Sequence, residues 1–236
     1  MPTHETPDPP SAHPYRSAAE PWTLDWDVLR VPYRDQDRMR LALSSGLAHG
    51  CIVIDPAARD LIAVHGSEGP PPRLQIVGGE ITLGWQVSFG DWLRDAFRAY
   101  NRYVAIVLHP AVEWTIASRG GLAHVDLDLA AGTVARIDVR GGCSDVRCEL
   151  PRPRVAVPIR IAGGASKLVV QRPADAGVAL ATSGGMAALR LDDQRFDAIG
   201  GAARLETRNA ERGAPRYELQ IDGGAADLAI ERRELA

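Results

Sequence analysis

The feature that most constrains the fold is a pair of adjacent glycines that recurs along the chain between two segments of alternating apolar residues. Clear copies are "WTIASRGGLAHVDLDL", "ARIDVRGGCSDVRCEL", "VPIRIAGGASKLVVQR", "VALATSGGMAALRLDD" and "YELQIDGGAADLAIER", and weaker copies are "LQIVGGEITLGW" and "FDAIGGAARLET". Most steps between the later pairs are 21 to 23 residues long, and only the step from Gly185 to Gly201 is short, at 16 residues. Self-similarity at such a period is typical of repeat architectures.

Each repeat predicts two short β-strands, one on either side of its glycines. The position five residues before the second glycine is apolar in every copy, as is the position four residues after it. The position six residues after it is apolar in every copy except one, where Thr207 stands. Because this spacing has a period of two, each segment reads as a strand with one buried face.

The glycines predict the corner between the two strands of a repeat. A corner needs either a positive φ or a close approach of two backbone segments, and glycine allows both because it lacks a Cβ. The predicted turn glycines are Gly120, Gly121, Gly141, Gly142, Gly163, Gly164, Gly184, Gly185, Gly200, Gly201, Gly223 and Gly224.

Two architectures fit this pattern: a single-stranded β-solenoid, in which equivalent positions of successive coils stack, and an antiparallel β-sandwich of hairpins. A hairpin closed at the glycines of "ARIDVRGGCSDVRCEL" sets Asp138 opposite Asp145, and like charges destabilise a cross-strand pair. Stacked coils instead bring opposite charges together, Asp126 with Arg147, Asp138 with Arg160 and Asp145 with Lys167. The charges therefore favour an all-β solenoid with repeats of about 21–22 residues, and the hairpin sandwich stays the alternative.

Residues 88–103, "SFGDWLRDAFRAYNRY", interrupt the repeats and predict one amphipathic helix. Apolar residues recur there at helical spacing, and Asp91 is a candidate N-cap. We expect the helix to cover an open end or the apolar side of the stack, where bare strand edges invite aggregation. Its aromatic residues form a candidate interaction surface, and these are Trp92, Phe97, Tyr100 and Tyr103.

The remaining chain divides into a tail and one domain. Residues 1–21 contain six prolines and almost no apolar side chains, so they are predicted to be a disordered tail. Residues 22–236 are long enough to form a single all-β domain with a sizeable core.

Residues 104–231 also resemble a known family. The segments "VEWTIASRGGLAHVDLDL", "RGGCSDVRCELPRPRVAVPIRIAGGASKLVVQRP", "LDDQRFDAIGGAARLET" and "RYELQIDGGAADLAIE" are similar to the glycine-rich "toast-rack" β-solenoid domains of adhesins and adhesin heads, and especially to an uncharacterised bacterial subgroup. Related domains follow membrane segments in envelope-stress regulators. The resemblance implies the solenoid fold and an adhesin-like, protein-binding role, and its shared motifs are turn glycines and core positions.

Chemistry-bearing residues do not gather into a catalytic or metal-binding pattern. The histidines have no zinc-motif spacing, and Cys148 falls in an apolar column, which is typical of a small buried side chain. Asp192 and Asp193 are neighbours on one strand and so face opposite sides of the sheet. We therefore predict no metal, no cofactor and no enzymatic activity.

The strongest candidate binding feature is a basic segment at residues 136–172, which has eight basic side chains and three acidic ones. The strand period turns four of them outward, Arg140, Arg147, Arg160 and Lys167. Such a strip is suited to an acidic or phosphate-bearing partner, although it also fits a solvated face with ion pairs between coils. Because no aromatic residues interleave with these arginines and the net charge is −3, nucleic acid is not predicted as a partner.

Location and assembly are predicted from the ends of the chain and from the cysteines. The start has no basic segment followed by an apolar one, and the longest aliphatic run, "YVAIVL", is too short to span a bilayer. Three cysteines do not make a disulfide framework, so we expect a cytoplasmic protein without a membrane span. The charged ending from Glu231 to Glu234 discourages open stacking, so we expect a monomer or a closed homodimer.

These observations predict a non-catalytic β-solenoid scaffold or protein-interaction module, since solenoids offer extended binding surfaces. The first alternative is a sensor domain that recognises an anionic molecule, and the second is a carbohydrate-active enzyme.

Overall fold

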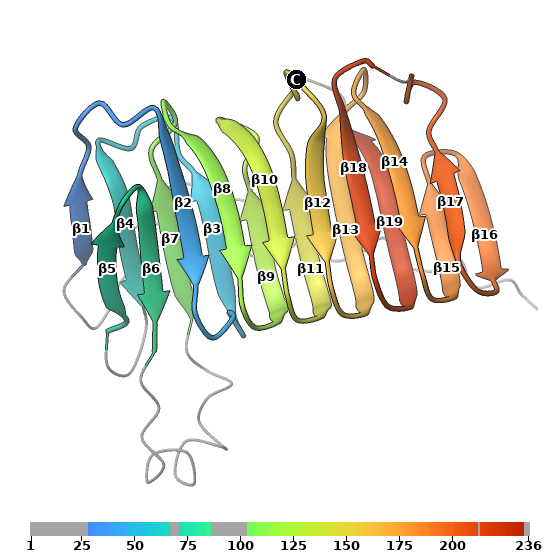
Figure 1. Cartoon of the computed structure of the whole chain (residues 1–236), viewed down its shortest axis with the longest axis horizontal. Coiled ribbons are helices and arrows are strands. Elements are labelled where there is room, and N and C mark those ends of the chain that lie inside the picture. The colour runs from blue at the N-terminus through green and yellow to red at the C-terminus, as the bar shows by residue number, and fades with distance from the viewer. Residues whose placement is uncertain (1–27, 67–70, 86–102, 212, 234–236) are drawn as a thin grey trace, which may run out of the picture.

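The computed structural model describes residues 28–66, 71–85, 103–211 and 213–233. Within these ranges the chain forms nineteen β-strands and no helix. The strands make two mixed sheets that lie face to face along the long axis of the molecule (Figure 1). The all-β class predicted from the sequence is confirmed. In this described part of the chain, no helix is long and apolar enough to cross a membrane.

One sheet has ten strands. In spatial order they are β1 (Leu29–Pro32), β4 (Asp60–Gly66), β7 (Val104–Leu108), β3 (Gly50–Ile54), β9 (Leu122–Asp128), β11 (Cys143–Glu149), β13 (Ala165–Pro173), β19 (Ala225–Arg233), β15 (Met186–Leu191) and β16 (Gln194–Ile199).

The other sheet has nine strands. In spatial order they are β17 (Ala203–Glu206), β14 (Gly177–Thr182), β18 (Arg216–Ile221), β12 (Val157–Ile161), β10 (Thr133–Val139), β8 (Glu113–Ser118), β2 (Arg38–Leu43), β6 (Glu80–Gly84) and β5 (Arg73–Val77).

Each clear repeat contributes one strand to each sheet. We use the word rung for a strand of the nine-stranded sheet, its Gly-Gly corner and the following strand of the ten-stranded sheet. The rungs β8–β9, β10–β11 and β12–β13 pair side by side in parallel, with Ile116, Ile137 and Ile159 in one row. Because β10 and β11 belong to different sheets, the glycines between them do not close a hairpin. Figure 1 shows these corners side by side along the lower edge.

The apolar columns of the repeats meet between the two sheets. Ile137 and Val146, on either side of one corner, are 2% and 3% exposed, and they belong to a core cluster that runs through the whole stack. Cys148 is buried in the same cluster, as its place in an apolar column predicts.

Close backbone approach explains most of the turn glycines. A Cβ on Gly141 would lie 2.4 Å from the backbone nitrogen of Gly121, and a Cβ on Gly163 would lie 2.8 Å from that of Gly142. The glycines also extend the ladder around the corner, since the N–H of Gly163 donates to the carbonyl of Gly141 at 3.2 Å. Among the twelve predicted turn glycines, all of which are described, only Gly201 has a positive φ.

A second regularity, not predicted from the sequence, lies three residues after the second glycine. Five residues there have a φ of 51° to 55°, and these are His124, Asp145, Lys167, Ala188 and Asp227. Asp and His tolerate this left-handed conformation better than most side chains. Each such residue shifts the in–out alternation of its strand by one position, and this is why positions one and four after the glycine both face the core. Neighbouring strands shift at the same position, so their register stays continuous.

The predicted charge pairs are partly present. Arg147 lies beside Asp126, and Asp138 lies beside Arg160, in the expected registers. The shortest ion pair of Asp138, however, joins it to Arg136 of its own strand at 2.5 Å. Residues two apart on one strand point to the same face, so their side chains are close enough to bond.

The third predicted pair is replaced by a different one. Asp145 and Lys167 both have the left-handed conformation, and the paired residues of β11 and β13 skip them. Among the described contacts, Asp145 bonds His124 of the preceding rung at 2.8 Å rather than Lys167.

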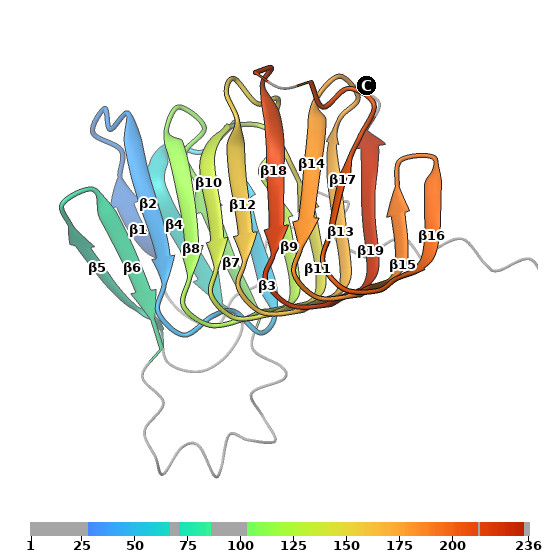
Figure 2. The same ribbon diagram turned by 45° about the vertical axis from the view of Figure 1, so that its right-hand side comes forward.

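The last repeat in sequence is not the last in space. β18 pairs with both β12 and β14, and β19 pairs with both β13 and β15, so this rung lies inside the stack (Figure 2). The prediction of a charged edge from Glu231 to Glu234 is therefore wrong for its described residues, Glu231, Arg232 and Arg233. Strands β16 and β17 end the stack instead, and both pair antiparallel with their neighbours. This reversal explains the short 16-residue step.

Thr207, which breaks the apolar column, follows β17 in this reversed segment. It is buried, and its hydroxyl accepts a hydrogen bond from the backbone N–H of Val178 at 2.9 Å. The helix predicted at residues 88–103 lies outside the described residues except for Tyr103, as does the predicted tail at residues 1–21.

The corner contacts predict different effects for two glycine substitutions. Gly141→Ala places a methyl group against the backbone of the preceding rung, so we expect the free energy of unfolding to fall by about 1–3 kcal/mol. Gly200→Ala is the matched control, because a Cβ there meets nothing within 4 Å, and its effect should stay within about 0.5 kcal/mol. Urea unfolding followed by circular dichroism measures both, and equal losses would contradict the packing argument.

Candidate functional site

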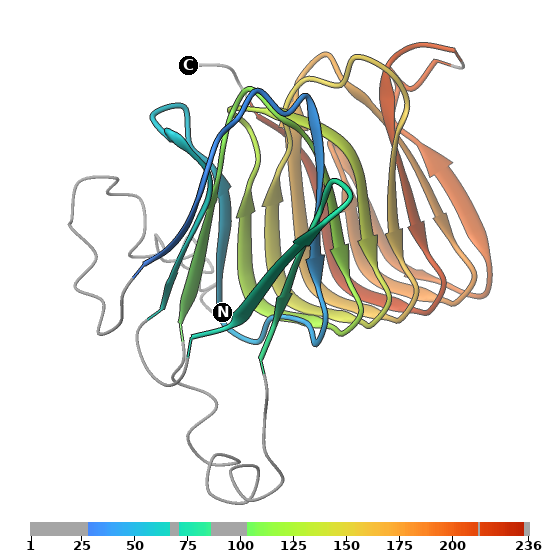
Figure 3. The ribbon, with the colours of Figure 1, turned by 60° about the vertical axis from the view of Figure 1, so that its left-hand side comes forward.

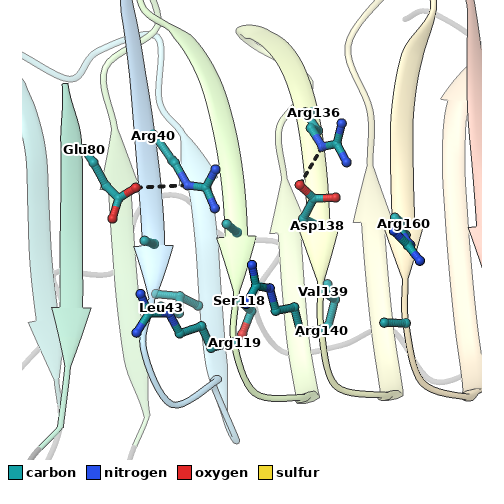
Figure 4. A pocket seen from close by; sticks show the side chains of 13 residues that line it. Arg40, Leu43, Glu80, Ser118, Arg119, Arg136, Asp138, Val139, Arg140 and Arg160 are labelled. Atoms are coloured by element: carbon teal, nitrogen blue, oxygen red, sulfur yellow. Dashed lines mark hydrogen bonds and ion pairs between the residues drawn. The ribbon is translucent and has the colours of Figure 1, made fainter. Parts of the chain in front are cut away.

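The outer face of the nine-stranded sheet carries a groove with a volume of about 520 Å³ (Figure 4). It crosses β6, β2, β8, β10 and β12, which are consecutive strands of that sheet. Its charged lining consists of five arginines and two carboxylates, an excess of three positive charges. These residues are Arg40, Arg119, Arg136, Arg140, Arg160, Glu80 and Asp138.

Small side chains make the floor of this groove. Ala42 and Ala117 lie side by side in register on β2 and β8, with their methyl groups on the outer face between core-facing neighbours. They are only 8% and 7% exposed although they face outward. Longer side chains on the surrounding positions therefore cover them and form the rim.

Most of the rim charges are already paired. Arg40 lies 3.1 Å from Glu80, and Arg136 lies 2.5 Å from Asp138. Arg160 donates two hydrogen bonds to one oxygen of Asp222, at 2.7 and 3.0 Å. The hydrogen bond from Arg160 is the main reason why the pKa of Asp222 lies below its usual value of 3.8.

Two arginines of the groove are left without a carboxylate. Arg119 and Arg140 directly follow β8 and β10, and their backbone N–H groups donate to Leu43 and Ser118 of the adjacent strands at 2.9 and 2.8 Å. Both are exposed, and neither forms an ion pair within the described part of the chain. Because adjacent parallel strands lie about 4.8 Å apart, the two cations lie side by side on the corner side of the groove.

The structure divides the four predicted binding residues between two faces. Arg140 and Arg160 line the groove, whereas Arg147 and Lys167 lie on β11 and β13 of the opposite sheet. The reason is the corner, since residues before and after a Gly-Gly pair belong to different sheets. Sequence reasoning missed Arg119, although it stands two residues before a second glycine, as Arg140 does.

The predicted aromatic interaction surface is only partly described. Trp92, Phe97 and Tyr100 lie outside the described residues. Tyr103 is half-buried just before β7, and its ring meets that of His49 edge-on at 5.2 Å.

The thiols and the predicted carboxylate neighbours are engaged in structural contacts. All three cysteines are buried and free, and burial raises the pKa of Cys143 to about 12. Asp192 accepts a hydrogen bond of 2.6 Å from the fully buried Arg172, and Asp193 accepts one of 2.5 Å from Arg232. The described residues contain no group of three or more His, Cys, Asp or Glu side chains that is able to hold a metal ion.

One carboxyl outside the groove has a raised pKa. Asp128 lies beside Glu149 on the outer face of the ten-stranded sheet. Partial burial, followed by the negative charge of Glu149, raises the pKa of Asp128. Arg233 bonds Glu149 at 2.8 Å, so this carboxylate is part of an ion pair between strands.

Comparison with solved structures shows a shared fold. A "putative cell adhesion protein" from Clostridium sporogenes matches with a TM-score of 0.60 at 17% identity, over 88% of this chain and 98% of that one. A "putative adhesin" from Bacteroides fragilis matches with a TM-score of only 0.19 at 6% identity, over 88% of this chain and 97% of that one, which is too low to indicate a common fold. No model of a protein family matches the chain, and no curated protein matches its sequence. The resemblance to adhesins noted in the sequence is thus matched at the level of the fold.

The bond between Arg160 and Asp222 predicts a pH-dependent effect. Arg160→Gln should raise the pKa of Asp222 towards 3.8, which a chemical-shift titration of its carboxyl measures. Because the folded-state pKa is lowered, the stabilisation by Arg160 is present in full at neutral pH and is lost as the pH falls below about 3.8. Wild type and variant should therefore differ in urea stability at pH 7, and the difference should shrink as the pH falls below 3.8. The exposed Arg154→Gln is the control, and an unchanged Asp222 titration in Arg160→Gln would refute the assignment.

Proposed function

We propose that this chain is a non-enzymatic β-solenoid module that binds an acidic segment of a partner protein in the groove of the nine-stranded sheet. The observation that carries the proposal is the pair Arg119 and Arg140, two exposed neighbouring cations without a carboxylate partner among the described residues. Arginine is suited to this role because its planar guanidinium binds carboxylates with two parallel hydrogen bonds.

The shape of the site favours an extended segment of polypeptide. The groove crosses five parallel strands, so its long dimension is about 19 Å at ~4.8 Å per strand. A segment lying across the strands passes over the alanine floor and runs alongside the free arginines, which border the groove on the side of the Gly-Gly corners. The parallel stacking of rungs in register, which is the basis for the solenoid interpretation, holds these side chains in fixed rows.

Two further observations support a binding role over catalysis. The fold is shared with a protein described as a "putative cell adhesion protein". The carboxylates Asp192 and Asp193 are tied to arginines, and the described thiols have raised pKa values, whereas a catalytic nucleophile needs an activated group.

A sensor for a small anion is the second candidate. The volume of about 520 Å³ falls within the range of small-molecule sites, about 300–1,000 Å³. A sensor of this kind uses the same free arginines, so the two candidate functions differ in the size of the ligand and not in the residues that bind it.

The proposal predicts which arginines matter for binding. We expect fluorescein-labelled poly-L-glutamate to bind the full chain at low salt, and the double variant Arg119→Ser/Arg140→Ser to bind at least ~10-fold more weakly, since a hydrogen bond to a charged group contributes about 1.5–3 kcal/mol. The control Arg154→Ser/Arg195→Ser removes the same charge from exposed positions outside the groove and should keep wild-type affinity. Fluorescence anisotropy measures all three proteins.

Each other outcome has a defined meaning. Equal losses of affinity in both double variants would show that binding depends on net charge alone, and would refute the groove as the binding site. Thermal stabilisation by inorganic phosphate that depends on Arg119 and Arg140, without peptide binding, would favour the sensor over the protein-binding module.

A further inference from the structure

Strand β5 is an exposed apolar edge. It lies at the end of the nine-stranded sheet and pairs only with β6, through a hairpin closed by Gly78 and Gly79. Ile76 and Val77 are 45% and 64% exposed. The described residues contain only three exposed large apolar side chains, so two of them lie on this one strand. Figure 3 views the molecule from this end.

The other three sheet edges carry protective features that β5 lacks. β1 is four residues long, ends in Pro32 and bears Arg30. β17 is equally short and bears Arg204 and Glu206. β16 has a charged residue at two of its six positions, Arg195 and Asp197. Short strands, prolines and charges are the usual means of preventing edge pairing, whereas β5 has no charge after Arg73 at its start.

The hairpin fixes which backbone groups of β5 are free. In a two-residue hairpin the pair that flanks the turn is hydrogen-bonded, and the pairs then alternate along the strands. Val77 and Glu80 flank the turn here, so Val77, Gln75 and Arg73 bond to β6. The N–H and C=O groups of Leu74 and Ile76 therefore point away from the sheet.

We propose that a second copy of this chain pairs antiparallel with β5, with the two-fold axis at Gln75. Leu74 of each copy then lies opposite Ile76 of the other, so the outward-pointing backbone groups satisfy one another. An axis at Leu74 would pair Ile76 with Pro72, which has no N–H, and an axis at Ile76 would pair Leu74 with Gly78 of the turn. Only the axis at Gln75 uses both free residues of β5.

Charge complementarity also selects a second copy. The neutral Gln75 faces itself, and the two Arg73 residues lie at opposite ends of the pair, about 14 Å apart along the strands at ~3.4 Å per residue. Arg73 of each copy is placed opposite Val77, in the same row and on the same face as Glu80. The only charged side chain of β5 therefore lies in the row of a carboxylate, which also bonds Arg40 at 3.1 Å, and avoids its own copy.

The resulting assembly is a closed dimer of limited affinity. A two-fold contact uses the same strand of both copies, and the charged edges at β16 and β17 prevent further growth. Because a five-residue strand gives a contact at the small end of the range for protein interfaces, we expect a concentration-dependent equilibrium between monomer and dimer.

Sedimentation equilibrium of the full chain over a range of concentrations tests the dimer. We expect Ile76→Lys to raise the dissociation constant at least ~10-fold, because a lysine on an edge strand blocks pairing. Val155→Lys is the matched control, since Val155 is 62% exposed in a loop and its substitution changes charge and apolar area alike. A wild-type protein that stays monomeric at all concentrations, or equal effects of both variants, would overturn the proposal.

Cross-linking tests the axis itself. Facing residues of an antiparallel pair that are not hydrogen-bonded have Cα atoms about 4.5 Å apart, within the range of a disulfide. Gln75→Cys should therefore form a disulfide-linked dimer on mild oxidation, whereas Arg73→Cys should not. The native thiols are buried and should not compete. Equal cross-linking of the two variants would refute the axis. Slow hydrogen exchange of the Leu74 and Ile76 amides in a monomer would show that another segment of the same chain covers β5, which would also refute it.

Discussion

The architecture depends on the contact between backbones of neighbouring rungs at the Gly-Gly corners. A Cβ on Gly141 would stand 2.4 Å from the next backbone, and no side chain fits such a gap. Because the strands approach this closely at the corner, hydrogen bonds continue from one sheet into the other. The same contact fixes the register of each rung against the next. That register in turn places Ala42 beside Ala117 and Arg119 beside Arg140, so the groove follows from the corners.

The two outer faces of the molecule carry different charge arrangements. On the nine-stranded sheet, carboxylates neutralise three of the five groove arginines and leave two free. On the ten-stranded sheet, Asp128 and Glu149 lie side by side, and Arg233 bonds Glu149. A side chain that turns outward is thus available to a partner only where its neighbours in the row do not already bond it. Counting outward charges along the sequence does not reveal this difference.

For the five clear repeats, the sequence was sufficient to predict the strands, corners and local register, because these depend on residues within one repeat or on equivalent positions of adjacent repeats. Strands β1–β4 and β7 flank no Gly-Gly pair and were not predicted, and the copy at Gly78 and Gly79 closes a hairpin within one sheet. The order of the rungs was not predictable in this way. The apolar columns of β18–β19 match those of β14–β15, so nothing local indicates which rung follows β13. The ion pair between Arg160 and Asp222 depends on that order. The candidate site was predicted only in part. Arg140 and Arg160 were identified from the sequence, but placing them on a different face from Arg147 and Lys167 required the assignment of strands to sheets.

The position of the β18–β19 rung also imposes an order on folding. Residues 213–233 are made after all the other described strands, yet they lie between β12–β13 and β14–β15. Until residues 213–233 leave the ribosome, the β12–β13 and β14–β15 rungs lack the rung that lies between them in the folded protein. Their facing strand edges and apolar columns have no native partner during this time. Contacts between distant parts of a chain form slowly, and exposed edges during that delay favour misassembly. The equivalent segment of another molecule fits between the same two rungs, so we expect exchange of residues 213–233 between nascent chains to be a route of misfolding for this architecture.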